Sequence, residues 1–302
     1  MLDLHRLRLL RELKHRGTLA AVAAALSYSP SAVSQQLSVL EREVGVPLLE
    51  PSGRRVRLTP QAEILVAHTE AVLERLERAE ADLAASLDGL IGTVRIAVFQ
   101  TAAMALLPEA LTLLREAHPG LRVEITQAEP ETALPALSAR DFDLVVAEEY
   151  PGNPNPRPAE IEQEELFRDE MRLASPGGED LAAAAGLPWV MEPAGTASRH
   201  WAMTLCRSAG FEPDVRFESS DLLLQSRLVE EGHAVAFLPD LVWVGRTPSV
   251  ALRPLPADVN SRWIFTAVRR GGGDHPAVRA CRRALDRAVA ALDRGPGRLP
   301  TP

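Results

Sequence analysis

Residues 18–45 read TLAAVAAALSYSPSAVSQQLSVLEREVG, and this stretch decides the fold of the first part of the chain. Thr18 can cap a helix made mostly of alanine, whose small side chains let a neighbouring helix approach closely. After a short polar turn, Ser29 is a favourable N-cap and Pro30 suits the first helical turn, so a second helix is predicted to begin there. Its apolar residues recur at helical spacing and predict one buried stripe, Val33, Leu37 and Leu40.

The other face of this second helix carries short hydroxyl and amide groups. Near a helix N-terminus such groups can bind phosphates and read base edges in the major groove, although a solvated polar face looks the same. The surroundings favour DNA: an apolar helix over 4–13 precedes, and a basic hairpin, SGRRVRLT, follows at 52–59. This order predicts a winged helix-turn-helix over residues 1–58 that binds double-stranded DNA. The predicted DNA contacts are Ser29, Pro30, Ser31, Ser34, Gln35, Ser38, Arg54 and Arg55.

Residues 59–89 contain no helix breaker before the final glycine and predict one long helix. A heptad of apolar or near-apolar positions runs along it: Leu65, Thr69, Val72, Leu76, Ala79 and Leu83. So narrow a seam, flanked by charged residues, is typical of a helix that pairs with a second helix. We therefore expect a homodimer through this segment. The alternative, a helix lying along its own domain, stays open.

From residue 90 the pattern changes to alternating strands and helices, and 93–147 predicts a βαβαβ unit of an open parallel sheet. Ligands of such sheets bind beyond the carboxyl ends of the strands. That rule selects Gln100, Thr101 and Glu148, and from a later strand–helix junction Thr196, Ser198 and Arg199. Free amides at that helix start suit a carboxylate, whereas Glu148 can meet an amino or hydroxyl group. Glu129 and His200 are interpreted as ordinary polar residues.

Charge and cysteine content narrow the class of protein. The net charge is −8 over 302 residues, yet the first sixty residues are basic on balance, which suits a phosphate-binding module on an acidic body. The two cysteines, Cys206 and Cys281, argue against a disulfide framework. No secretory signal or membrane span is recognisable, so we expect a cytoplasmic protein. No phosphate loop, zinc spacing or nucleophile motif is present, so the sequence predicts no enzyme, no cofactor and no metal site.

The N-terminal motifs resemble those of LysR-type transcriptional regulators. The similarity runs through the alanines at 20–25, SPSAVS at 29–34, LEREVGVPLL at 40–49 and VRLTP at 56–60. Three positions depart from the family pattern, Leu49, Pro51 and Glu63. The missing arginine at Pro51 removes one wing contact, which Arg54 and Arg55 can supply.

The resemblance implies a multidomain protein: an all-α winged helix-turn-helix head, a long linker helix and an α/β, two-lobed, periplasmic-binding-protein-like (type 2) effector domain. Over 90–302 it implies lobe I at about 90–163 and 265–302 and lobe II at about 164–264. It also implies a homotetramer that can contact RNA polymerase. We expect a sequence-specific regulator controlled by a carboxylate-bearing effector between the lobes. Two alternatives remain: a redox-sensing regulator using Cys206 and Cys281, and a small-molecule receptor without direct DNA readout.

Overall fold

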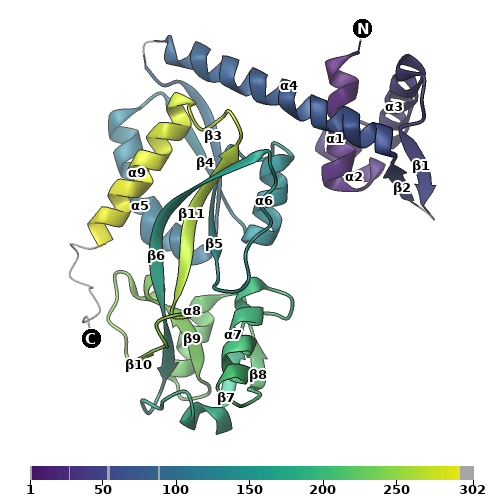
Figure 1. Cartoon of the computed structure of the whole chain (residues 1–302). Helices are drawn as coiled ribbons and strands as arrows, with labels where there is room; N and C mark the ends of the chain where they lie inside the picture. The colour runs from purple at the N-terminus through teal and green to yellow at the C-terminus, as the bar shows by residue number, and fades with distance from the viewer. Residues whose placement is uncertain (1, 27, 53–54, 88, 293–302) are drawn as a thin grey trace.

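The computed structural model describes residues 2–26, 28–52, 55–87 and 89–292. Its first domain consists of α1 (Leu4–Arg16), α2 (Leu19–Ala25), α3 (Pro30–Val44) and the hairpin β1 (Leu49–Ser52) and β2 (Arg55–Leu58). Figure 1 shows this N-terminal domain at one end of the molecule. The predicted stripe is confirmed, because Val33, Leu37 and Leu40 are buried against α1 and α2. The predicted helix–helix–helix–wing order is therefore correct.

Helix α4 (Pro60–Ala85) connects the two parts of the chain. Thr59 caps it, with its Oγ1 accepting from the amide of Ala62 at 3.2 Å. One face of α4 is buried on its own chain, at Ala62, Val66, Thr69, Leu73, Glu77 and Ala81. Four of the six predicted heptad positions, Val72, Leu76, Ala79 and Leu83, are exposed. The helix thus lies on its own chain along one face and leaves most of the heptad seam open on another.

Lobe I contains the predicted βαβαβ unit. Strands β3 (Gly92–Val98), β4 (Leu121–Gln127) and β5 (Leu144–Glu149) are parallel, with α5 (Gln100–Ala117) and α6 (Pro130–Ser138) between them. The returning strand β11 (Ser261–Arg269) pairs antiparallel with β5, and α9 (Pro276–Leu292) packs beside α5. Apolar side chains from these elements form the core of the lobe, so the α/β prediction is confirmed.

Lobe II is reached by one long strand, β6 (Ile161–Ser175). The first part of β6 pairs with β11, and its last part pairs with β9 (Ala236–Pro239) and β10 (Ala251–Pro254). The remaining elements are β7 (Pro188–Met191), α7 (Ala197–Ser208), β8 (Asp214–Glu218), α8 (Leu222–Glu230) and the short 3-10 turns η1 (Ala183–Gly186) and η2 (Asp240–Trp243). The sequence did not indicate β10, nor that one strand would run through both lobes.

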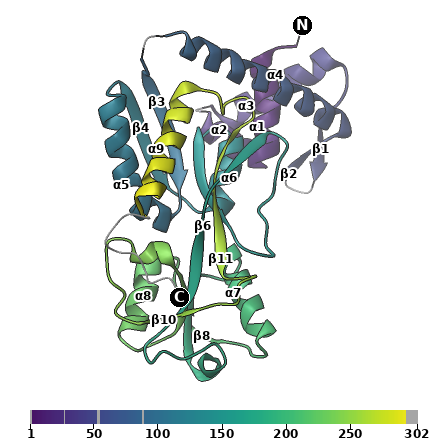
Figure 2. The same ribbon diagram turned by 60° about the vertical axis from the view of Figure 1, so that its left-hand side comes forward.

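The turned view in Figure 2 shows where α6 lies within this arrangement. In both views α6 lies between the N-terminal domain and α7 of lobe II. Among the described residues, no helix combines the length and apolar character needed to cross a membrane.

Candidate DNA interface and effector cleft

The N-terminus of α3 has the geometry expected of a reading helix. The Oγ of Ser29 accepts from the amide of Ala32 at 3.1 Å and lies 2.9 Å from the Oγ of Ser31. Pro30 occupies the first turn, where its missing N–H costs no intrahelical hydrogen bond. The predicted contacts on this helix share one property: all of them, Ser29, Pro30, Ser31, Ser34, Gln35 and Ser38, are exposed. The face opposite the apolar stripe is therefore open.

The wing follows α3 directly. Strands β1 and β2 pair antiparallel, with Ser52 opposite Arg55. Arg54 lies outside the described residues, and Arg55 is placed only by its backbone in β2. Glu41, which the sequence did not single out, ties the wing to α3: its Oε1 accepts from the amides of Leu48 and Leu49 at 2.8 and 3.1 Å. The wing is thus held at a fixed angle beside the reading helix.

In the effector domain, Gln100 bridges the two lobes. Its Nε2 donates to Oδ1 of Asp221 at 2.8 Å, and its Oε1 accepts from the amide of Leu222 at 2.9 Å. Asp221 and Leu222 begin α8 of lobe II, whereas Gln100 begins α5 of lobe I. The sequence predicted Gln100 at the cleft; the structure places it in a contact across it.

Thr101 and Glu148 lie behind the cleft in a buried network around Arg262, which is 1% exposed. The Arg262 guanidinium donates to the Thr101 hydroxyl at 2.6 Å, to Asp169 at 2.8 Å and to Glu148. The Tyr150 hydroxyl donates to Glu148 at 3.2 Å. Both predicted residues are therefore engaged by this arginine.

Arg262 and Asp169 were not selected from the sequence. Arg262 is on β11 and Asp169 on β6, and these two strands pair antiparallel and connect the lobes. Burial raises the pKa of Asp169 to about 6, against the effect of the Arg262 charge. No local pattern distinguishes Arg262 from Arg269 at the other end of β11, so the sequence offers no signal for its role.

The start of α7 carries the other predicted residues. Thr196 caps the helix, its Oγ1 accepting from the amide of Arg199 at 3.2 Å. The Arg199 guanidinium donates to the carbonyl of Glu192 at 2.9 Å and to Glu218 at 3.1 Å, both within lobe II. The amide of Ala197 donates across the lobes to the carboxylate of Glu131 at 3.1 Å. An internal carboxylate thus occupies the helix N-terminus predicted to bind a ligand carboxylate.

A cavity of about 540 Å³ opens beside this helix start. Thr196 and Arg199 line it, whereas Ser198, half-buried on the first turn of α7, does not. His200 and Arg207 of α7 add further donors to its wall, and 153–156 close it from the other side. Arg199 and Arg207 give this wall cationic donors, which suit an anionic group of small-molecule size, although Glu131 also lines the cavity and bonds to the Ala197 amide.

From the sequence Glu129 is interpreted as an ordinary polar residue and Glu192 is not selected, yet both carboxyl groups lie near Glu148. Burial, with the charges of Glu148 and Glu131, raises the pKa of Glu129 to about 7. Burial, with the charges of Glu148 and Glu129, raises the pKa of Glu192 to about 8. Glu129 follows β4 and Glu192 follows β7, so the strand-end rule that selected Glu148 applies to them as well.

Metal and redox chemistry find limited support among the described residues. His15, Glu70 and Glu160 bring ligand atoms within 4.8 Å of one another. The Oε1 of Glu70, however, already contacts Arg11 at 2.7 Å and His15 at 3.0 Å, so ordinary ion pairing satisfies it. Cys206 and Cys281 are buried in the cores of different lobes, and burial raises the pKa of each thiol to about 12.

Comparison with known proteins agrees with both halves of the structure. Residues 4–63 match the family described as bacterial regulatory helix-turn-helix protein, lysR family, and 87–290 match the LysR substrate binding domain. The probable HTH-type transcriptional regulator LrrA of Synechococcus elongatus is 30% identical over 92% of this chain and 94% of its own. The transcriptional dual regulator GltC of Bacillus subtilis is 28% identical over 83% of this chain and 85% of its own.

Solved structures show the same fold. Full-length OxyR from Pseudomonas aeruginosa superposes with a TM-score of 0.65 at 21% identity, over 94% of this chain and 95% of its own. CbnR in complex with its target DNA superposes with a TM-score of 0.52 at 22% identity, over 94% of this chain and 99% of its own. The matched families consist of transcriptional regulators and not of enzymes. With both family domains matched in order, the chain belongs to the LysR family of DNA-binding transcriptional regulators.

Proposed function

We propose that this regulator binds a specific operator through α3 and the wing, and that a carboxylate-bearing small molecule in the inter-lobe cleft controls its activity. The observation that carries the effector chemistry is the contact between Glu131 and the amide of Ala197. It supports a carboxylate position at the N-terminus of α7, beside a cavity of suitable size. The proposed DNA contacts remain the exposed face of α3 together with Arg54 and Arg55.

The same contact implies that an effector must compete with the protein itself. A ligand carboxylate that takes the amide of Ala197 displaces the carboxylate of Glu131, which is exposed and can turn to solvent. Glu131→Ala should therefore tighten carboxylate binding, whereas Arg199→Ala should weaken it. Arg216→Ala is a matched control, because this exposed arginine pairs with Asp214 away from the cavity.

Thermal-shift screening of the full chain against amino acids and aromatic acids tests the proposal. A hit should raise Tm, with a larger shift in Glu131→Ala and a smaller one in Arg199→Ala. The hit should also change binding to operator DNA, recovered by selection from random duplexes, in a gel-shift titration. Equal shifts in all three variants would place the ligand elsewhere. Loss of DNA binding together with a lower Tm in Arg199→Ala would mean that this arginine is structural only.

We also propose a dimer through α4 that assembles into a tetramer in the cytoplasm, where two reading helices meet two half-sites of one operator. The exposed heptad residues Val72, Leu76 and Leu83 support it, because burying such an apolar seam against a second helix removes it from water and is favourable. Leu76→Glu should dissociate the assembly in sedimentation experiments. Contact with RNA polymerase stays a prediction.

Redox sensing is the second candidate. A relative named as a probable hydrogen peroxide-inducible genes activator, from Mycobacterium avium, is 30% identical over 73% of this chain. The buried thiols with raised pKa values do not favour such a role here, since the thiolate is the species that reacts with peroxide.

A further inference from the structure

The short helix α6 ends in a way that leaves two carbonyls open. The amide of Asp141 donates to the carbonyl of Ala136 at 2.9 Å, and the amide of Arg140 donates to that of Leu137 at 3.0 Å. This pair of hydrogen bonds is a Schellman motif. It satisfies two of the last helical carbonyls, while those of Ser138 and Ala139 have no intrahelical partner.

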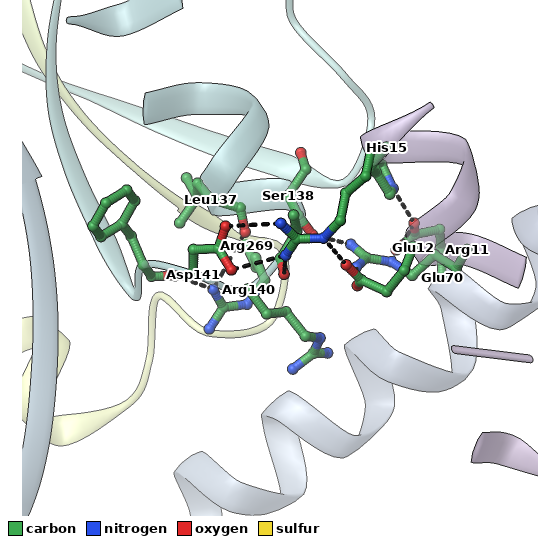
Figure 3. Close-up of polar contacts among 12 residues, drawn as sticks. Arg11, Glu12, His15, Glu70, Leu137, Ser138, Arg140, Asp141 and Arg269 are labelled. Carbon is green, nitrogen blue, oxygen red and sulfur yellow. Dashed lines mark hydrogen bonds and ion pairs between the residues drawn. The ribbon is translucent and has the colours of Figure 1, made fainter. Parts of the chain in front are cut away.

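Two arginines of the N-terminal domain bind these open carbonyls (Figure 3). Arg11 donates to the carbonyl of Ser138, and Nη2 of Arg16 donates to that of Ala139 at 3.1 Å. Nη2 of Arg16 also donates to Asp141 at 2.8 Å. Arg11 is 1% exposed, so its guanidinium is committed to this contact and to its carboxylate partners Glu12 and Glu70. Helix α1 thus caps α6 from another domain.

The residue in the left-handed position of the motif is an arginine. Arg140 has a φ of 66° and is the only non-glycine residue with positive φ in the described part of the chain. Glycine normally takes this position because an L side chain is strained there. The Arg140 guanidinium contacts Glu77 of α4 at 2.7 Å, and Arg269 contacts the same oxygen at 2.6 Å. The strained residue therefore also holds the linker helix against lobe I.

The other end of α6 lies at the effector cleft. Glu131, in its first turn, makes the contact with the Ala197 amide of lobe II, and Glu129 is its N-cap residue. Between the two ends, Ala133, Leu134 and Leu137 pack on the sheet along one face of the nine-residue helix. At 1.5 Å per residue it spans roughly 13 Å from the cleft to α1.

We propose that α6 couples the effector cleft to the DNA-binding domain within a single chain. This rests on the proposed effector position at the start of α7. When a ligand carboxylate replaces Glu131 on the Ala197 amide, the first turn of α6 loses its hydrogen bond to lobe II. The helix then shifts along the sheet, and the carbonyls that accept from Arg11 and Arg16 move with it. The position of the N-terminal domain relative to lobe I therefore depends on whether Glu131 or a ligand carboxylate occupies the cleft.

Hydrogen–deuterium exchange of the full-length protein tests the coupling without a known effector. Glu131→Ala releases the cleft end of α6, and Arg16→Ala releases the other end at a partly exposed residue. Glu131→Ala should speed exchange at the last amides of α1, Lys14 to Arg16, by about threefold or more. Arg16→Ala should speed exchange of the Ala197 amide by a similar factor, and the double variant should show less than the product of the two effects.

Matched controls separate coupling from local loosening. Thr132→Ala perturbs the first turn of α6 without touching lobe II, because Thr132 bonds only to the carbonyl of Glu129 among the described residues. Lys14→Ala perturbs α1 at an ion pair with Glu63 that leaves α6 untouched. Both should change exchange only at their own ends. Effects of Glu131→Ala and Arg16→Ala that stay at the mutated end would overturn the coupling. Failure to find a carboxylate ligand, by contrast, would refute the proposed effector and leave this measurement unaffected.

Discussion

On α3 the side chains predicted to read DNA point to solvent, whereas in the cleft the predicted ligand contacts are largely engaged by the protein. Ser34 and Gln35 are exposed and make no side-chain hydrogen bond within the described chain. Gln100 and Glu148, by contrast, have partners on the opposite lobe or on the strands that connect the lobes. At the proposed contacts, DNA would meet side chains that are already exposed, whereas an effector would have to replace contacts within the protein.

This difference has an energetic consequence. Removing a side chain from the reading face should change binding and leave stability unchanged. Removing one from the cleft network should change stability first, because its partners are then buried without compensation.

Arg262→Met should cost about 3–5 kcal/mol of stability, because it leaves the buried carboxyls of Glu148 and Asp169 without their cation. Urea denaturation of the full chain measures the loss. Arg207→Met is the matched control: its pair with Glu212 is exposed on both sides and should contribute little to stability. A loss in Arg262→Met as small as in the control would show that the network does not hold the lobes together.

Glu192 should make stability fall as the pH rises. Its pKa is about 8 in the folded chain and 4.5 as the ordinary value, so the native state keeps a proton that the unfolded state releases. Stability is therefore lost between about pH 4.5 and pH 8, by roughly 5 kcal/mol in all at about 1.4 kcal/mol per pKa unit. Glu192→Gln should flatten the profile of unfolding free energy against pH. The exposed carboxylate variant Glu212→Gln should leave the profile unchanged, and an equally steep profile in Glu192→Gln would contradict the assignment.

Replacing Ser34 and Gln35 together by alanine should weaken operator binding by about 10- to 100-fold, since a base contact contributes about 1–3 kcal/mol. Tm should stay within the error of the unaltered protein, because both side chains are exposed. Fluorescence anisotropy with operator and random duplexes makes the measurement. Ser86→Ala, at the end of α4, is a control that should leave affinity unaltered. Equal weakening on both duplexes would show phosphate contact without sequence readout.

Hydrogen peroxide should have the smallest effect. With both thiols buried and their pKa values raised to about 12, treatment at neutral pH should leave Cys206 and Cys281 reduced. Thiol titration after unfolding measures this, and operator affinity should be unchanged. Consumption of one thiol with a change in affinity would restore the redox alternative.

The sequence predicted the local structure well because its signals are local. Ser29, Pro30 and the stripe at Val33, Leu37 and Leu40 determine α3 within one segment, and the strand–helix alternation in lobe I follows from periodicity. The lobe boundaries, the DNA contacts and the effector contacts remain predictions. Their support differs, since α3 presents its face to solvent while the cleft residues contact each other.

What the sequence did not indicate depends on pairing between distant residues. Arg262 meets Asp169 only because β11 returns beside β6, and no local pattern specifies that register. The capping of α6 by Arg11 and Arg16 likewise joins segments more than a hundred residues apart. The sequence indicates no partner for either arginine, and only the packed structure shows what they bind.

The path of β6 determines the order in which the two parts of the chain can fold during synthesis. The N-terminal domain is built from neighbouring segments, α1 to the first turns of α4, and can fold as soon as they leave the ribosome. The sheet joining the two lobes cannot close until β11 has been made, because β11 lies between β5 and β6. A chain that stops before residue 261 would therefore carry a finished DNA-reading domain on an unfinished receptor, and would occupy operators without responding to any signal.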